Sequence, residues 1–186
     1  YEKSPSNSRV MAPTKKLVSE INNLVQSKVN PGGQRLRFKM HGDLFYLDLR
    51  LNDAILFTQN QYDKGIQNGS LGKLVSVESN DGIFGVAELD TGTKIEINQA
   101  ILDSIQLGYA ITLHKAQGSQ FPIVIVALKS GRITDRAWLY TAITRAESEI
   151  HIVGSEKDFR AITEAPSKSH QRNSWLATLL SSEADD

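Results

Sequence analysis

The hydrophobic pattern at the start of the chain predicts a strand followed by a helix. Residues 8–12 form a short, mostly apolar run of strand length. Thr14 then occupies the position at which a hydroxyl caps a helix, and Asn30-Pro31-Gly32-Gly33 predicts where that helix ends. The apolar positions between them fall on one helical face and are Leu17, Ile21, Leu24 and Val25.

The middle of the chain changes to short alternating runs separated by turn residues. Strands are expected at residues 54–58, 72–79, 83–89 and 94–98. Asn80-Asp81-Gly82 predicts a tight hairpin, because two residues of such a turn must adopt positive φ. Alternation buries one face of a strand, and the apolar positions concerned are Val75, Val77, Ile95 and Ile97. We expect a small antiparallel meander; the pattern of residues 36–51 is irregular and predicts no element.

From residue 108 onward, strand-length apolar runs alternate with helical patterns, which is typical of an α/β fold. Strands are expected at 109–112, 123–128 and 149–153, a helical turn at 113–117, and helices at 134–146, 156–162 and 175–180. The continuous apolar run at 123–128 is typical of a parallel strand buried on both faces. The inward positions of the helix at 134–146 are Trp138, Leu139, Ala142 and Ile143.

Composition narrows the class of protein without naming a function. The sequence has no cysteine, so it offers neither a disulfide framework nor a cysteine-ligated zinc site. No apolar run reaches the length of a membrane span, and the first residues lack the apolar stretch of a signal peptide. We therefore expect a cytoplasmic protein with no membrane partner. The sequence begins at Tyr1 without Met, and we expect it to be part of a longer chain.

Charge is balanced overall, with 21 basic and 21 acidic residues, but it is unevenly distributed. Residues 108–146 contain five Lys or Arg and one acid, hence 5 − 1 = +4. Residues 43–103 contain four bases and ten acids, hence 4 − 10 = −6. A bound polyanion is therefore expected in the second half of the chain.

A polar run follows the predicted strand at 109–112 and continues to the next apolar strand. Side chains at the carboxyl ends of strands line the ligand crevice of an open parallel sheet. Thr112, His114 and Lys115 can each donate to phosphate oxygens. Gly118 would allow a backbone to approach closely. The alternative interpretation is a strand, a turn and a strand with incidental polar residues.

This run resembles helicase motif V of the RecD/TraA group, whose usual form is T-x-H-K-S-Q-G-S-E. The matching residues are Thr112, His114, Lys115, Gln117, Gly118 and Ser119. Ala116 replaces the usual Ser, and Gln120 replaces the usual Glu. The resemblance implies that Thr112, His114 and Lys115 bind single-stranded DNA. It also implies ATP-binding roles for Gln117, Gly118 and Gln120.

A second run, Tyr140-Thr141-Ala142-Ile143-Thr144-Arg145-Ala146, is similar to motif VI of the same helicases, Y-T-A-x-T-R-A. Every named position is filled. An arginine presents a fixed fork of N–H groups to the γ-phosphate while charge develops there during hydrolysis. The resemblance therefore implies that Arg145 is a catalytic arginine finger. Without the motif, a surface arginine near the end of a helix would explain the residue.

Two further segments resemble weaker motifs of the family. Residues 10–22 are similar to motif IV, which implies a DNA contact at Thr14, although an ordinary capped helix explains Thr14 equally well. Residues 52–73 resemble G-D-x-V-x-x-x-x-N-x-Y…N-G-x-x-G, with Asn52 in place of the first Gly. This segment implies a DNA contact at Asn60 or Tyr62. Both residues could instead buttress a turn.

The chain contains no Walker A loop, G-x-x-x-x-G-K-[ST]. The segment from Gly69 to Leu74 has the wrong glycine spacing and lacks a hydroxyl after Lys73. ATP and Mg²⁺ are therefore expected to be bound mainly by an N-terminal motor domain of the same polypeptide. No metal ligands are assigned in this chain, and alone it is expected to hydrolyse ATP negligibly.

The resemblance implies the C-terminal (UvrD-like) motor domain of a superfamily I helicase of the RecD, or exodeoxyribonuclease V alpha-subunit, type. Residues 8–35 and 105–165 would form a RecA-like parallel-sheet domain, 36–104 a β-rich, SH3-like insertion, and 166–186 a helix and tail. Expected partners are single-stranded DNA, the N-terminal motor domain, and recombination or conjugation subunits.

Two other hypotheses remain open at this point. The chain could belong to a catalytically inactive, helicase-like scaffold of a conjugative relaxase that binds DNA or protein. The insertion could alternatively serve mainly as a protein-interaction module, because its −6 balance disfavours contact with bare DNA.

Overall fold

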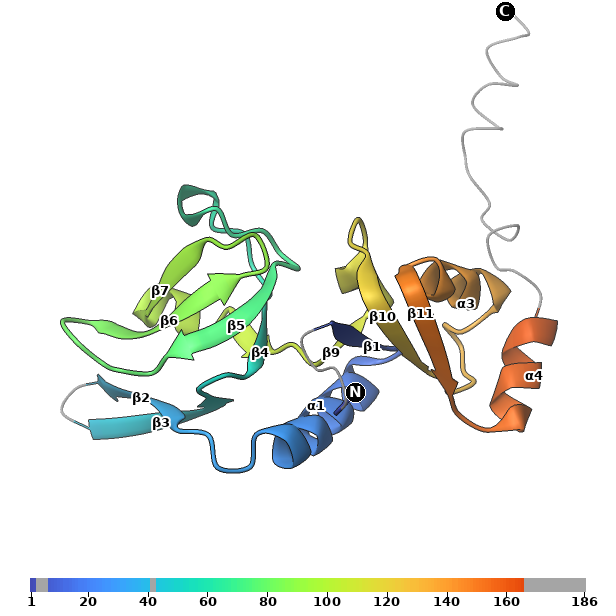
Figure 1. The fold of residues 1–186 in the computed structure, drawn as a ribbon, viewed down its shortest axis with the longest axis horizontal. Helices are drawn as coiled ribbons and strands as arrows, with labels where there is room; N and C mark the ends of the chain where they lie inside the picture. The colour runs from blue at the N-terminus through green and yellow to red at the C-terminus, as the bar shows by residue number, and fades with distance from the viewer. Residues whose placement is uncertain (3–6, 41–42, 166–186) are drawn as a thin grey trace, which may run out of the picture.

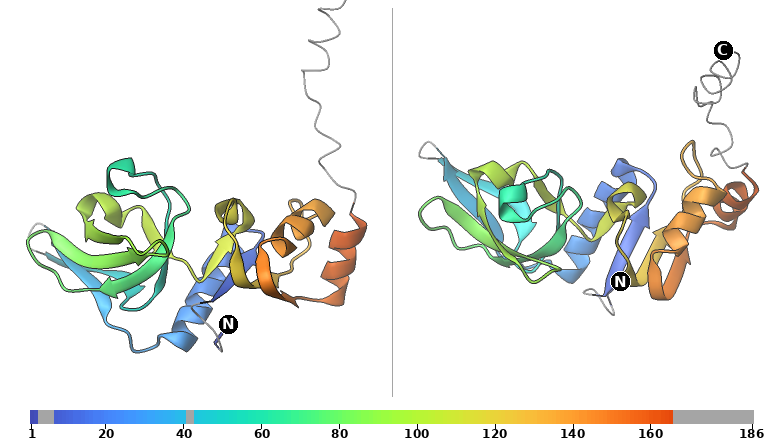
Figure 2. Two further views of the ribbon diagram at one scale, coloured as in Figure 1. Left: turned by 45° about the horizontal axis from the view of Figure 1, so that its top comes forward. Right: turned by 90° about the horizontal axis from the view of Figure 1, so that it is seen from above.

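Two lobes make up the computed structural model, which describes residues 1–2, 7–40 and 43–165 (Figure 1). One lobe contains a parallel sheet with helices, and the other contains antiparallel strands. The lobes lie side by side along the long axis of the molecule (Figure 2). This arrangement confirms the expected α/β class with a β-rich insertion. The predicted helix at 175–180 and the predicted tail lie outside the described residues.

The parallel sheet has four strands in the order β11-β10-β1-β9. Their bounds are β1 Ser8–Ala12, β9 Ala110–Thr112, β10 Phe121–Ala127 and β11 Ala146–Val153. β1 lies in the centre, where Val10 is aligned with Ala110 on one side and with Ile125 on the other. The first strand of the chain is therefore held between strands from its second half.

Helices cover both faces of this sheet, as a parallel sheet requires. α1 (Lys15–Val29) packs through Val18 against Val10 and Ala110 on one face. α3 (Arg136–Ile143) and α4 (Glu156–Glu164) pack through Leu139 and Ile162 on the other. No helix among the described residues is long and apolar enough to cross a membrane.

α1 begins and ends where the sequence predicts, and Leu17 and Ile21 pack partly buried against the core as expected, but the most buried positions are shifted around the helix. Thr14 Oγ1 accepts a hydrogen bond from the Leu17 N–H at 3.2 Å, which confirms the cap. Leu24, expected to face the core, is 60% exposed. The buried positions are Val18, Asn22 and Gln26. Two of these are amides because this face meets polar groups at the junction between the lobes.

α3 is shorter than the helix predicted at 134–146. Asp135 caps it by accepting from the Trp138 N–H at 2.8 Å, and Ile143, expected to point inward, is 37% exposed. The chain leaves the helix at Thr144, and Ala146 already pairs with Phe121 as the first residue of β11. Pairing within the sheet therefore limits the last turn, and Arg145 lies in the short link between helix and strand.

The insertion contains a five-stranded antiparallel sheet in the order β7-β6-β5-β4-β8. Its strands are β4 Ala54–Phe57, β5 Leu71–Ser76, β6 Ile83–Leu89, β7 Lys94–Asn98 and β8 Ile105–Leu107. Two short helical segments, η1 (Tyr62–Lys64) and α2 (Gln99–Leu102), lie between strands. Asp81 and Gly82 adopt φ values of 47° and 81°, as the predicted hairpin requires. A register shift between Leu74 and Ser76 buries Leu74 where Val75 was expected.

Residues 36–51, for which the pattern predicts no element, form a separate hairpin. β2 (Arg35–Met40) pairs antiparallel with β3 (Asp43–Arg50). Leu36 and Leu49 are buried in the same core as the strands of the five-stranded sheet. β8, at residues 105–107, pairs with β4 in the insertion. The division at residue 104 and the comparison with SH3-like barrels remain predictions.

Asp158 connects the start of α4 to the segment after β10 and gives a testable pH dependence. Its carboxylate accepts from the Ser130 hydroxyl and backbone N–H and from the Ser155 hydroxyl. These hydrogen bonds lower the pKa of Asp158 from 3.8 to about 2. Because the folded-state pKa is depressed, this contribution to stability is present above the unfolded value and is lost as pH falls toward 2.

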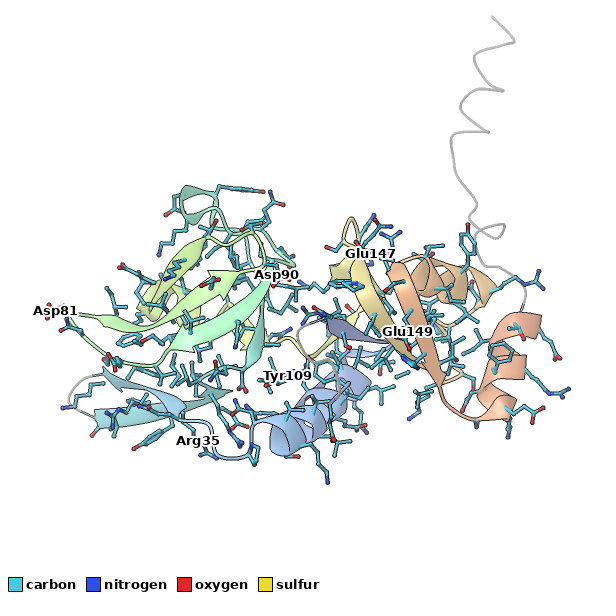
Figure 3. All side chains as sticks on the ribbon, in the orientation of Figure 1. Arg35, Asp81, Asp90, Tyr109, Glu147 and Glu149 are labelled. Atoms are coloured by element: carbon cyan, nitrogen blue, oxygen red, sulfur yellow. The ribbon has the colours of Figure 1, made fainter. Side chains whose placement is uncertain are left out.

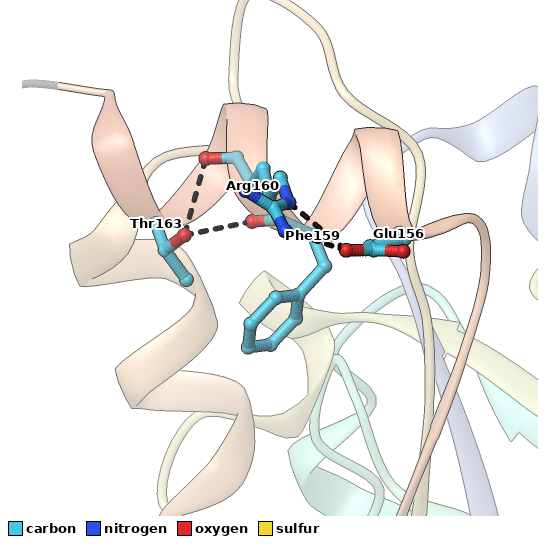
Figure 4. Close-up of polar contacts among 4 residues, drawn as sticks. All are labelled: Glu156, Phe159, Arg160 and Thr163. Atoms are coloured by element: carbon cyan, nitrogen blue, oxygen red, sulfur yellow. Dashed lines mark hydrogen bonds and ion pairs between the residues drawn. The ribbon is translucent and has the colours of Figure 1, made fainter.

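We expect NMR titration of the Asp158 carboxyl to give a midpoint near 2, and a higher midpoint in Ser130→Ala, in which the Ser155 hydroxyl and the backbone N–H of residue 130 still donate to the carboxylate. Glu156 of the same helix is a suitable internal reference, because it contacts only exposed Arg160, four residues along α4 (Figure 4). An Asp158 midpoint that does not move in Ser130→Ala would contradict this account.

Candidate nucleotide and nucleic-acid surfaces

The polar run after β9 crosses the parallel sheet from one edge to the other. Thr112 ends β9 alongside Ala12, at the carboxyl edge of the sheet. β10 begins at Phe121, and Ile123 is aligned with Ser8 at the amino edge. The eight residues between, 113–120, include the 3-10 turn η2 (Leu113–Ala116). The run therefore reaches from the carboxyl edge to the amino edge of the sheet, because β9 and β10 both pair parallel with β1 and the chain must cross over between them.

Arg145 lies beside the last residues of this crossover, at the amino edge of the sheet, and forms hydrogen bonds with them. Its guanidinium donates from Nη1 to the carbonyl oxygen of Ser119 at 3.3 Å and from Nε to that of Thr141 at 3.4 Å. The Arg145 carbonyl in turn accepts from the Phe121 N–H at 2.9 Å. The side chain is partly exposed, and within the described residues it forms no salt bridge. Two of its five N–H groups are used, so the others can meet an anion.

The backbone beside Arg145 is open to a ligand. Gly118 has a φ of 84°, and no atom lies within 4 Å of the position that a Cβ would take. Gln117 and Gln120 are both exposed. They line a cleft of about 680 Å³ that continues between the two lobes. The structure thus brings the three residues assigned to ATP binding, Gln117, Gly118 and Gln120, to the same edge as Arg145.

A second groove, of about 510 Å³, opens at the carboxyl edge of the sheet. It is lined by residues of α1, β9 and the insertion, among them Lys15, Thr112 and Lys115. Burial, and then the charge of Lys15, lower the pKa of the Lys115 ammonium. Two cations that repel each other attract an anion placed between them. His114 lies exposed on η2, two residues after Thr112 and next to Lys115, which also lines the first cleft.

The insertion contacts Lys115 directly. The Lys115 ammonium donates to the side-chain oxygen of Asn68, and the Asn68 backbone N–H donates to Asn60 Oδ1 at 2.6 Å. A Cβ on Gly69, whose φ is 103°, would lie 3.2 Å from the Lys115 carbonyl oxygen. Asn60 therefore supports a turn, which is one of the two interpretations of this residue, and Tyr62 is 75% exposed.

A buried carboxylate at the junction between the lobes carries no role in the sequence interpretation. Asp53 is fully buried. It accepts from the Gln26 and Asn30 amides at 2.6 Å and from the Tyr109 hydroxyl and Arg50 backbone N–H at 2.7 Å. Burial, followed by the hydrogen bond to Asp53, raises the pKa of Tyr109 well above its ordinary value. The acid of the G-D pattern was the signal that could have indicated this cluster.

Arg9 is the other residue that sequence interpretation missed. It is 6% exposed in the central strand, although it is charged. Its Nη1 donates to the Gly108 carbonyl at 2.8 Å, and Nη2 lies 3.7 Å from Asp90 of the insertion. Tyr109 and Asp90 both lie where the lobes meet (Figure 3). Among the described residues, no group of three or more His, Cys, Asp or Glu side chains could hold a metal ion.

Comparison with known proteins shows which class has this arrangement. Residues 107–153 match the family model of the UvrD-like helicase C-terminal domain. The chain is 31% identical over 156 residues to the ATP-dependent RecD2 DNA helicase of Deinococcus radiodurans, covering 81% of this chain and 20% of that protein. It is 38% identical over 112 residues to the RecBCD enzyme subunit RecD of Mycolicibacterium smegmatis, covering 59% and 19%.

Two further matches extend this picture. The conjugal transfer protein TraA of Rhizobium radiobacter is 29% identical over 107 residues, covering 58% of this chain and 10% of that protein. A crystal structure of Pif1 helicase from Bacteroides in complex with ADP-AlF3 and ssDNA has a TM-score of 0.63 at 19% identity, covering 89% and 44%. Pif1 helicase from Candida albicans has a TM-score of 0.58 at 14% identity, covering 97% and 51%. These structures share the fold.

Taken together, the matches make the chain similar to the class of UvrD-like helicase C-terminal domains, and the Pif1 structures share its fold. Within that class it is similar to RecD and TraA proteins, and it spans a fifth or less of the length of these relatives.

Proposed function

We propose that the chain is the C-terminal motor domain of an ATP-dependent DNA helicase of the RecD/TraA type. The observation that carries the proposal is the crossover at 113–120, which joins two edges of one sheet. One edge presents Arg145, Gly118 and Gln120, and the other presents Thr112 beside Lys15 and Lys115. A single short segment therefore links a surface suited to a nucleotide with a surface suited to phosphate backbone.

On the nucleotide side, Arg145 would act on ATP held mainly by an N-terminal motor domain. Its fork can donate to the γ-phosphate while its other N–H groups remain on the Ser119 and Thr141 carbonyls. Gln117, Gly118 and Gln120 would line the same cleft and contact the nucleotide. Mg²⁺, when bound in that N-terminal domain, would neutralise charge on the phosphates.

On the DNA side, Thr112, His114 and Lys115 would donate to the backbone of single-stranded DNA. Thr14 Oγ1 accepts the cap hydrogen bond but can still donate its own O–H to a phosphate. The side-chain N–H groups of Asn60 can likewise meet DNA while its oxygen supports the turn. When the cleft around ATP closes, movement at Gly118 would shift the grip at Thr112 through the crossover.

Replacing Lys115 with alanine tests the DNA side. For single strands, log K falls with log salt by about 0.7 per phosphate contact, so Lys115→Ala should lower the magnitude of that slope by about 0.7. Fluorescence anisotropy of labelled oligo(dT) at several salt concentrations measures the slope. Lys157→Ala, an exposed lysine of α4, is the matched control. Equal slopes in both variants would contradict the assigned contact.

A second candidate is a DNA-binding scaffold without motor function, which the similarity to TraA brings forward. Both the motor and the scaffold are compatible with partner subunits from recombination or conjugation. Assays on the whole polypeptide that contains this sequence distinguish the motor from the scaffold. A motor shows ATP turnover that DNA stimulates, and it separates DNA strands. A scaffold binds the same oligonucleotides without turnover, and that result would overturn the motor proposal.

A further inference from the structure

The β2–β3 hairpin presents a basic and aromatic face to solvent. Arg37 is paired with Tyr46 and Lys39 with Leu44, so these four residues share one face. The other face of the hairpin carries Leu36 and Phe38 toward the core of the insertion. Tyr46 is 58% exposed and Leu44 is 46% exposed. A large aromatic side chain therefore lies in solvent directly across from an arginine.

The cations of this hairpin are not neutralised within the protein. Arg35, Arg37 and Lys39 are exposed along β2, and none forms a salt bridge within the described residues. The nearby acids of the hairpin are Asp43 and Asp48, both exposed. Residues 51–104 contain eight acids and three lysines, hence 3 − 8 = −5. The hairpin is thus a basic strip on an otherwise acidic lobe, and its charge is complementary to a polyanion.

Next to this strip lies an open cavity of about 910 Å³, lined by Arg37, Lys39, Phe38 and Phe84 among others. Phe38 stacks on Phe45 at 5.5 Å between ring centroids and contacts Phe84 at 5.3 Å. Aromatic rings therefore lie beside the basic strip.

The hairpin is also continuous with the groove at the carboxyl edge of the parallel sheet. That groove is lined both by Thr112 and Lys115 and by Leu47, Asp48 and Leu49 of β3. Tyr46 is the next residue along the strand. A chain that leaves Lys115 along the groove would therefore reach the hairpin.

We propose that the β2–β3 hairpin is a second binding site for single-stranded DNA, reached by the strand after it leaves Lys115. Arg37 and Lys39 bind backbone phosphates, and Tyr46 stacks on a base, the combination used by sequence-indifferent single-strand binders. The inference rests on the proposed DNA groove. It assigns a DNA contact to the insertion despite the −6 balance of residues 43–103.

Two oligonucleotide lengths test the site in this chain. We use labelled oligo(dT) of about 4 nucleotides, for the Lys115 groove alone, and of about 16 nucleotides, for groove and hairpin together. In Arg37→Ala/Lys39→Ala, the salt slope for the long oligonucleotide should fall by about 1.4, from two contacts of about 0.7 each. Tyr46→Ala should weaken its binding on the order of tenfold, and Tyr46→Phe should retain it. Binding of the short oligonucleotide should not change.

Lys129→Ala/Lys157→Ala is the matched control, since it removes two exposed lysines from the other lobe. If the long oligonucleotide binds the hairpin variants as it binds this control, the hairpin site is overturned and a protein contact becomes the better account of its exposed face. If the hairpin variants bind normally while Lys115→Ala still lowers the salt slope, the proposed DNA groove at Lys115 is retained and only the hairpin site is rejected. A wild-type chain that binds neither oligonucleotide overturns both.

Discussion

Replacing Arg145 with alanine in the whole polypeptide is expected to lower ATP turnover by about 10³-fold or more. In the proposed role, the guanidinium stabilises charge that develops on the γ-phosphate. Lys129, Arg132 and Arg136, the basic residues before and within α3, are all exposed, and Arg136 donates to the Thr163 carbonyl of α4. Steady-state phosphate release in the presence of single-stranded DNA measures the loss.

Two further variants test whether the loss of ATP turnover depends on the fixed geometry of the Arg145 guanidinium. Arg145→Lys keeps the charge but cannot hold both carbonyls and the phosphate, so most of the loss should remain. Arg160→Ala removes an exposed arginine of α4 that pairs only with Glu156, and it should leave turnover unchanged (Figure 4). DNA binding by Arg145→Ala should be normal, because Thr112 and Lys15 lie at the opposite edge. Full turnover in Arg145→Ala would refute the arginine-finger role.

Replacing Asp53 with alanine is expected to destabilise the chain by about 3 kcal/mol. Gln26 and Asn30 each keep another acceptor, the carbonyl oxygens of Asp48 and Leu51. The Tyr109 hydroxyl and the Arg50 N–H lose the acceptor that binds them. A buried donor left without an acceptor costs roughly 1–3 kcal/mol, and two such donors give the expected loss. Chemical denaturation followed by tryptophan fluorescence measures it.

Tyr109→Phe provides the matched comparison for Asp53. It removes one donor and leaves the carboxylate with three, so the expected loss is about 1 kcal/mol. Glu88→Ala, an exchange on the insertion surface away from this cluster, should change the free energy of unfolding by less than about 0.5 kcal/mol. An Asp53→Ala variant no less stable than Tyr109→Phe would show that the four hydrogen bonds contribute little.

Local chemistry made several elements predictable from sequence. The hydroxyl of Thr14 and the turn residues after Val29 set the limits of α1, and the bounds of β6 and β7 agree with the alternating pattern around Gly82 and Gly92. In each case the information lies within a few residues of the element. The matching of residues 112–119 to a family motif likewise identified the segment that joins the two candidate surfaces.

Features that depend on distant partners were not predictable in the same way. The buried face of α1 is set by Asp53 and by the backbone of Ala110, which accepts from and donates to Asn22. The edge at which Gln120 lies follows from the pairing of β10 with β1. The hairpin at 35–50 is irregular in sequence because its pairing shifts register between Arg35 and Arg37 and because Leu44 and Tyr46 are exposed on its outer face. The periodicity of apolar residues along the chain does not reveal contacts between residues that are distant in sequence.

The close approach of Gly69 to the Lys115 carbonyl has a mechanical consequence. A Cβ on Gly69 would lie only 3.2 Å from this oxygen, and Arg9 and Asp53 add polar contacts between the lobes. We therefore expect the two lobes to move together. In the proposed motor, the hinge that couples nucleotide hydrolysis to stepping is then expected outside this junction, at the face that carries Arg145.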